Sequence, residues 1–194
     1  MSDQKVFVAQ RAGPQNIYVG GVMETFSLQI EQVLSLVQNY RQYTRYFSLA
    51  KEVTPAGDST DWAAKRYYVE LGTWSIPARI WSIVRVDDLQ ATDHGTALLF
   101  FEKVESDTLH QKWMEKNEKR HRVLDAKEFM GYWAVDSISK DRVRIAFVAM
   151  MDPGFYVPGW LMRFAWRVML PKLLKDIQQT LEHEKSDFLQ SSPE

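Results

Sequence analysis

The chain has 194 residues, a length typical of one domain rather than two. It contains no cysteine, which excludes disulfide bonds, thiolate zinc sites, iron–sulfur clusters and cysteine nucleophiles. With 24 basic and 25 acidic residues the net charge is -1, so the chain lacks the broad positive field that drives nonspecific nucleic-acid binding. We therefore expect no nucleic-acid partner.

No apolar run approaches the length of about 18 residues that a membrane-spanning helix requires. The best run, 145–151, has the length of a strand. Residues 1–10 are polar and lack the apolar block of a secretory signal. We expect a soluble protein, cytoplasmic, or periplasmic or secreted if a signal peptide was removed from a precursor.

The first elements are short and well separated. Segments 5–10 and 17–23 carry β-branched and aromatic residues and flank the turn residues 12–14, which predicts two opening strands. Ser27 suits an N-cap position, and apolar residues then recur at helical spacing over 30–40. An amphipathic helix is predicted there, continued by a second short helix or a packed loop.

From residue 62 the apolar pattern changes to a period of two, which predicts strands. Charged residues dominate 106–127, which lacks proline and glycine and predicts a helical insertion or a long loop with a mixed solvated face. A long helix closes the chain, and Pro171 inside it predicts a kink or break. The five predicted strands are 62–71, 78–86, 97–104, 129–138 and 142–151.

This order of elements predicts an α+β fold with a mostly antiparallel sheet. The simplest packing lays the last helix across the concave face of a curved sheet and can enclose an apolar cavity. We expect a cavity of about 300 to 1,000 Å³. The predicted domain is 1–185, followed by a short polar tail, 186–194.

The last third of the chain resembles a known family. Asp152-Pro153-Gly154, then Pro158, Trp160 and Leu161, and a helix with Pro171 before Leu173-Leu174, resemble the closing segment of START domains. Gly131-Tyr132-Trp133, leading into 142–151, resembles their last two strands. A looser likeness covers 77–81, where Ile80 stands at a position that usually carries an acid.

The resemblance implies a helix-grip fold within the Bet v 1-like, or SRPBCC, superfamily. Members of that superfamily commonly hold lipids, sterols or polyketides between the sheet and the C-terminal helix. Fold likeness by itself assigns neither a ligand nor a reaction.

Sequence signatures of catalysis are missing. The chain has no Walker loop, dinucleotide glycine fingerprint, His-Glu-x-x-His helix or Gly-x-Ser-x-Gly elbow. Its histidines, at 94, 110, 121 and 183, are scattered, which favours surface positions over a metal-binding or basic role. We expect no catalytic residue, no metal and no cofactor.

Aromatic residues gather between positions 129 and 166. Core packing and a cavity wall both explain Trp133 and Phe147, because both demand an inward apolar side chain. Arg79 and Glu102 either face solvent or point inward to a ligand's polar end, where a charge must be paired. The candidate ligand-cavity residues are Arg79, Trp81, Phe100, Glu102, Trp133, Ile145, Phe147, Ala149, Leu161, Phe164 and Val168.

A second group of aromatic residues surrounds a proline and glycine turn, where solvent exposure is expected. Phe155, Tyr156 and Trp160 either contact a membrane or staple the start of the last helix. Arg163 and Arg167 follow on that helix and suit anionic headgroups. All five are candidate contacts with a gate or, transiently, with a membrane surface.

The strand 142–151 is apolar on both faces. An antiparallel strand with one face in solvent is expected to alternate between apolar and polar residues. The second face, with Ala146, Val148 and Met150, is covered by the 106–127 insertion, by another subunit or by a bilayer. The sequence does not predict an oligomeric state.

Our leading functional prediction is a noncatalytic carrier or sensor of a hydrophobic small molecule, a lipid above all. One alternative is an enzyme like the polyketide cyclases or aromatases, for which Tyr68, Arg79, Glu102 and Tyr132 are the candidate polar residues. Another is a protein-interaction module whose cavity is filled by side chains.

Overall fold

The computed structural model describes residues 4–10, 18–57, 65–73, 76–92, 95–105, 107–120 and 123–190. The predicted turn at 12–14, the beginning of the strand predicted from residue 62, and His94 and His121 lie outside the described residues.

The elements that the sequence predicts follow one another in the predicted order, and the structure adds β3, β6 and β8. The first half of the chain forms β1 (Lys5–Gln10), β2 (Tyr18–Phe26), α1 (Ile30–Gln38), the short 3-10 turn η1 (Tyr40–Gln42), α2 (Tyr43–Tyr46), β3 (Ala50–Pro55), β4 (Arg66–Thr73) and β5 (Ile76–Val86). The second half forms β6 (Gln90–Ala91), β7 (Thr96–Lys103), α3 (Asp107–Glu118), β8 (Val123–Asp125), β9 (Glu128–Ser139), β10 (Arg142–Asp152) and α4 (Gly159–Gln190).

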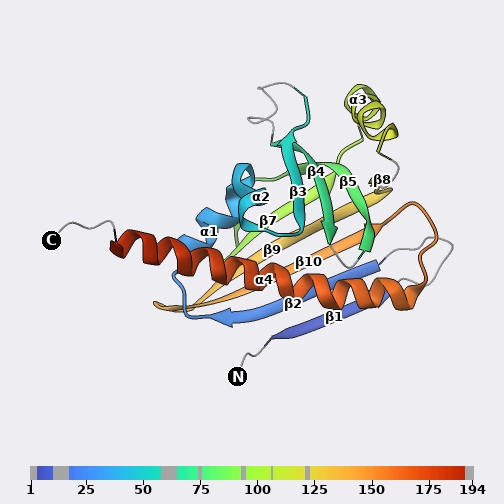
Figure 1. Ribbon diagram of the computed structural model, residues 1–194. Coiled ribbons are helices and arrows are strands. Elements are labelled where there is room, and N and C mark those ends of the chain that lie inside the picture. The colour runs from blue at the N-terminus through green and yellow to red at the C-terminus, as the bar shows by residue number, and fades with distance from the viewer. Residues whose placement is uncertain are drawn as a thin grey trace.

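The strands form one curved sheet in the order β1-β2-β10-β9-β7-β5-β4-β3, with β6 paired to β7 and β8 to β5. Every pairing among the described strands is antiparallel except that of β5 with β8. Helix α4 runs across one face of this sheet, with α1 and α2 near one end and α3 beyond β8 (Figure 1). The predicted α+β architecture, a curved antiparallel sheet gripping the C-terminal helix, is confirmed.

Three local predictions were wrong. Ser27 is not the cap of α1, because the helix begins at Ile30 and the backbone N–H of the preceding Gln29 donates to Oε1 of Gln32 at 3.3 Å. Strand β3 was not predicted, because its charged Lys51 and Glu52 obscure the alternation. Of the kink or break predicted at Pro171, the break does not occur, because α4 continues through that residue. The carbonyl that loses its helical partner there belongs to Arg167, an exposed residue, so the lost hydrogen bond is not buried.

The main core lies between the concave face of the sheet and α4. Alternate residues of β10, among them Ile145, Ala149 and Met151, point into it and meet Trp166 and Leu170 of α4. Burial of these side chains removes apolar surface from water at about 25 cal/mol per Å². Apolar burial at this interface therefore supplies most of the free energy that holds the last helix on the sheet.

A second, smaller cluster covers part of the opposite face of the sheet. It contains Ala56, Tyr68, Trp81, Ile83 and Trp113, the last of which comes from α3 and donates its indole N–H to the carbonyl of Ala56 at 2.6 Å. The 106–127 insertion thus covers β4 and β5. The outer side chains of β10, at Ala146, Val148 and Met150, are partly buried without joining this cluster.

Candidate functional site

The structure has a partly open cavity between the concave face of the sheet and α4. Its volume is about 120 Å³, counted as the space open to the centre of a water molecule. Trp133, Phe147, Ala149 and Met151 of β9 and β10 form one wall, and Trp166, Met169, Leu170 and Leu173 of α4 cover it. The cavity is smaller than the range of about 300 to 1,000 Å³ that the sequence analysis expected.

Three of the candidate cavity residues line this space: Trp133, Phe147 and Ala149. They share one face of two paired strands, because Phe147 lies opposite Trp133 in the register. The rings of Trp133 and Phe147 are in contact, with centroids 4.6 Å apart. Ile145 points the same way but lies farther along β10, where it is fully buried in solid core.

Four candidates from β5 and β7 point away from the cavity. Trp81 belongs to the cluster under α3, and Arg79 pairs with Glu70 on that same outer face. Glu102 is half-exposed and pairs with Arg85, while the ring of Phe100 meets that of Tyr132. The residues of these strands that line the cavity are on the other face, at Val84 and Val86 in β5 and at Leu99 and Phe101 in β7. Placing these four in the cavity was wrong, because the opposite face of each strand was assigned to the cavity. Side chains alternate between the two faces of a strand, so an error of one residue reverses the direction of every side chain.

The candidate cavity residues on α4 also do not line the cavity. Phe164 and Val168 are exposed, and Leu161 is partly buried but does not line the cavity. The inward residues are Trp166, Met169, Leu170 and Leu173. Because apolar residues surround the first half of α4, its sequence does not reveal which stripe faces the sheet.

The sequence analysis missed the aromatic end of the cavity. This end is lined by Tyr40 of η1, Tyr43 of α2 and Phe47, which follows α2. Successive members of the three are about one helical turn apart. Tyr40 lies with its ring centroid 5.1 Å from that of Tyr67 on β4. The helical spacing of these three aromatics was a usable signal, because it puts them on one side of a short helical segment.

Tyrosine is the only ionisable residue type in the cavity lining that the structure describes. Burial is the main cause that raises the pKa of Tyr40, Tyr43 and Tyr67 above the usual value. The hydroxyl of Tyr43 donates to the backbone carbonyl of Val37. These phenols therefore stay neutral near pH 7 and cannot serve as bases there.

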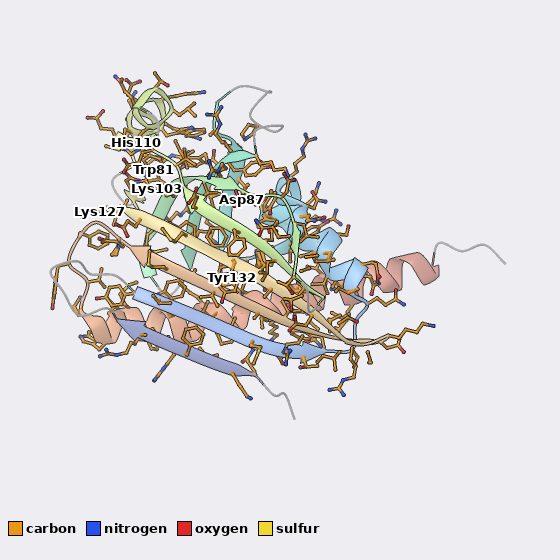
Figure 2. The ribbon with its side chains drawn as sticks, turned by 180° about the vertical axis from the view of Figure 1, so that it is seen from behind. Trp81, Asp87, Lys103, His110, Lys127 and Tyr132 are labelled. Atoms are coloured by element: carbon orange, nitrogen blue, oxygen red, sulfur yellow. The ribbon has the colours of Figure 1, made fainter. Side chains whose placement is uncertain are left out.

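The polar residues considered for a cyclase lie on the outer face. Figure 2 views the sheet from behind and shows Trp81, Lys103 and His110 gathered beside α3, with Tyr132 farther along the same face. The hydroxyl of Tyr68 is 3.2 Å from Oδ1 of Asn117 and is buried under α3. Tyr68, Arg79, Glu102 and Tyr132 therefore do not line the cavity.

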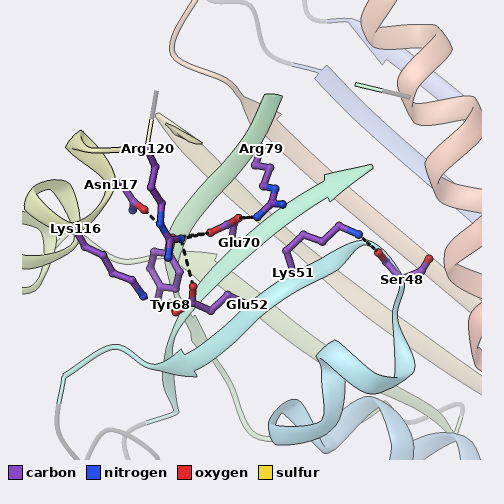
Figure 3. Close-up of polar contacts among 9 residues, drawn as sticks. All are labelled: Ser48, Lys51, Glu52, Tyr68, Glu70, Arg79, Lys116, Asn117 and Arg120. Atoms are coloured by element: carbon purple, nitrogen blue, oxygen red, sulfur yellow. Dashed lines mark hydrogen bonds and ion pairs between the residues drawn. The ribbon is translucent and has the colours of Figure 1, made fainter. Parts of the chain in front are cut away.

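A polar cluster ties α3 to the sheet on this outer face (Figure 3). The side chain of Glu70 is fully buried, and its two carboxylate oxygens lie 2.7 Å from Arg79 and 3.0 Å from Arg120. Lys116 pairs with Glu52 beside them. Because two guanidinium groups neutralise the Glu70 carboxylate, we interpret the cluster as a structural contact that holds α3 on the sheet.

The residues singled out for a gate or membrane contact lie together where the chain enters α4. Phe155, Tyr156 and Trp160 are exposed, as are Arg163 and Arg167. Their exposure argues against the alternative that the three aromatics staple the helix start. Val157, in the loop before the helix, is buried, and its carbonyl accepts a hydrogen bond of 2.7 Å from the Tyr18 hydroxyl.

Within the described part of the chain, no three His, Asp or Glu side chains are grouped closely enough to hold a metal ion. No helix in the same part is both long and apolar enough to cross a membrane.

A family model described as polyketide cyclase / dehydrase and lipid transport matches residues 26–178, most of the chain. No curated protein matches the chain. The matched segment runs from the end of β2 into α4 and so includes most elements that line the cavity.

Solved structures with the same fold include several START proteins. Human StAR-related lipid transfer protein 5 superposes with a TM-score of 0.68 at 9% identity, over 94% of this chain and 88% of that one. Human STARD10 gives 0.65 at 10% identity, over 96% and 76%. A START superfamily protein from Mycobacterium smegmatis gives 0.62 at 12% identity, over 85% and 97%. The helix-grip fold implied by the sequence resemblance is thus confirmed.

Proposed function

We propose that this chain, which belongs to the polyketide cyclase / dehydrase and lipid transport family, binds a hydrophobic small molecule in its cavity without transforming it. The observation that carries the proposal is the cavity under α4, whose lining, among the described residues, holds aliphatic and aromatic side chains and no acid, amide or strong base. Binding in such a space draws its free energy from apolar burial.

The charge state of the ligand follows from the same lining. An ionised group moved into this space would meet no counter-charge among the lining residues that the structure describes, and burial of an unpaired charge is very costly. The part of the ligand that enters the cavity is therefore uncharged. A charged headgroup, if the ligand has one, stays at the mouth in contact with water.

The size of the cavity also constrains the ligand. A space of about 120 Å³ does not admit a two-chain phospholipid in the form described. Met151 and Met169 are part of the lining, and unbranched methionine side chains adapt readily to a new neighbour. A small or single-chain lipid, with some displacement of these residues, fits best.

Transfer of the ligand requires a way in. We assign this role to the loop 153–158 and the start of α4, which the Tyr18 hydroxyl ties to β2 through Val157. Two solved neighbours are named for lipid transfer, human StAR-related lipid transfer protein 5 and the human StarD13 lipid transfer and protein localization domain. Those names support a lipid as cargo.

The family description also names cyclases. A cyclase needs a group that moves a proton, and the only candidates in the described lining are tyrosines that burial keeps protonated. We therefore place binding ahead of catalysis. The third alternative, a module with a filled interior, predicts no void, whereas the cavity is present.

The proposal is tested by lipid capture. Native mass spectrometry of the chain purified gently from a lipid-containing extract is expected to show a bound neutral or single-chain lipid. Ala149→Phe, which fills the wall, is expected to abolish capture, and Ala149→Leu to reduce it. Ala146→Phe on the opposite face of the same strand is the matched control and should capture lipid normally.

Failure of the wild-type chain to capture or bind any lipid would contradict the proposal. So would equal capture by the Ala149→Phe and Ala146→Phe variants, because the site would then lie elsewhere. Thermal unfolding of each variant verifies that the fold persists.

A further inference from the structure

The outward face of α4 carries a stripe of large apolar side chains that the fold leaves uncovered. Trp160 is 66% exposed, Phe164 is 53% exposed and Val168 is 39% exposed, at intervals of four residues. Tyr156, in the loop just before the helix, is 76% exposed. Single exposed apolar residues are ordinary, but a continuous row on one helix face marks an interaction surface.

This stripe is not a misplaced part of the core. The inward face of the same helix segment is made by other residues, such as Met162, Trp166 and Leu170, which are buried. At about 100° per residue, the row at 160, 164 and 168 lies on the side of the helix turned away from these three. Closing the protein around its cavity therefore does not cover the row.

The charges around the stripe are of one sign. Arg163 and Arg167 are exposed on the same side of the helix, and no acidic residue occurs from 153 to 175. Neither arginine forms an ion pair with a carboxylate of the described residues. Lys172, by contrast, pairs with Asp176 at 3.5 Å. The exposed face is thus apolar and cationic, without an acid of its own to neutralise it.

From this arrangement we propose that the outward face of α4 and the loop residue Tyr156 dock on an anionic lipid bilayer. Indole and phenol rings settle at the headgroup level, where their apolar bodies and polar edges are both accommodated. Phe164 and Val168 reach the acyl boundary, while Arg163 and Arg167 meet lipid phosphates and acidic headgroups. A bilayer suits this surface better than a protein partner, because a row of rings beside two exposed arginines matches the headgroup level and the negative charge of anionic lipids.

Docking in this orientation places the proposed gate at the membrane. The loop 153–158 adjoins the docking stripe through Tyr156 and is tied to the body of the protein through Val157. The docking proposal itself does not depend on cavity binding, since the stripe and the cavity lie on opposite sides of α4.

The test is cosedimentation of the full chain with vesicles of phosphatidylcholine alone and with added phosphatidylserine. Binding is expected to be stronger with phosphatidylserine and to weaken with salt. Arg163→Gln and Arg167→Gln should each lower the partition coefficient on phosphatidylserine vesicles about fivefold. Trp160→Asp should lower it about tenfold or more on both vesicle types.

Ile138→Asp is the matched control, because Ile138 is an exposed apolar residue at the β9–β10 hairpin, outside the stripe. It should bind vesicles like the wild type. Unchanged binding of Trp160→Asp, or an equal loss in Ile138→Asp, would overturn the proposal. Self-association of the wild type that Trp160→Asp abolishes, without any vesicle binding, would assign the stripe to a second copy and also overturn it.

A variant of the stripe outside the gate separates this proposal from cavity binding. Val168→Asp should weaken vesicle binding but still capture lipid in native mass spectrometry, and Ala149→Phe should still sediment with vesicles. If lipid capture fails while vesicle binding persists, the cavity proposal alone is wrong.

Discussion

Gly20 of β2 lies directly beneath the indole ring of Trp166. A Cβ atom on Gly20 would stand 2.7 Å from Cε3 of that ring and 3.1 Å from Cδ1 of Leu170, closer than nonbonded carbon atoms approach. Both partners line the cavity. The absence of a side chain at position 20 therefore sets how closely α4 approaches the sheet, and with it the height of the cavity.

Gly20→Ala should push α4 outward and destabilise the protein by about 1 to 3 kcal/mol, the usual penalty for overpacking a core. Urea unfolding measures this change. Gly21→Ala is the matched control, because the three atoms nearest to its Cβ would all belong to the exposed ring of Phe7, which can swing away. A loss in Gly21→Ala as large as that in Gly20→Ala would show that the contact with Trp166 does not set the effect.

Removing the buried charge of Glu70 should loosen α3. Glu70→Gln keeps the shape of the side chain but weakens its bonds to Arg79 and Arg120, and we expect a loss of about 2 kcal/mol in urea unfolding. Glu102→Gln is the control, since Glu102 and its partner Arg85 are both half-exposed and such pairs contribute less than about 1 kcal/mol. Equal losses in the two variants would contradict the structural role of the cluster.

The buried tyrosines predict a fall in stability at alkaline pH. Burial raises the pKa of Tyr40 and Tyr43 above the ordinary 10.0, so the folded chain keeps protons that the unfolded chain releases. Their contribution to stability is complete below pH 10 and is lost as the pH rises above it. Tyr43→Phe should reduce the alkaline slope of the unfolding free energy, measured in urea at a series of pH values. An unchanged slope would mean that this hydroxyl also ionises in the folded state.

The hydrogen bond from Tyr18 to Val157 should control opening of the loop 153–158. Tyr18→Phe leaves a buried carbonyl without a partner, at a cost of about 1 to 3 kcal/mol, which raises the open population about fivefold or more. Hydrogen exchange of the loop amides and the release rate of a bound apolar dye should both increase. Tyr132→Phe, on the outer face, should leave both rates unchanged. Release as slow as in the wild type would show that the ligand leaves by another route.

The sequence by itself predicted the order and type of most elements, because hydrophobic period and turn residues are local properties. It also predicted the α+β fold, the sheet covered by the last helix, and the inward direction of Trp133, Phe147 and Ala149. Those three belong to β9 and β10, which are consecutive in the sequence and pair across a short hairpin.

Only the tertiary structure decided which faces of β5, β7 and α4 look into the cavity. In β5, Trp81 and Ile83 are as apolar as Ile80 and Val84, because α3 covers the outer side and both faces are buried. In α4, one stripe is buried against the sheet while another is exposed to solvent. When a segment is apolar on every side, its pattern carries no direction, and the partner that packs against it from far along the chain determines which side is inside.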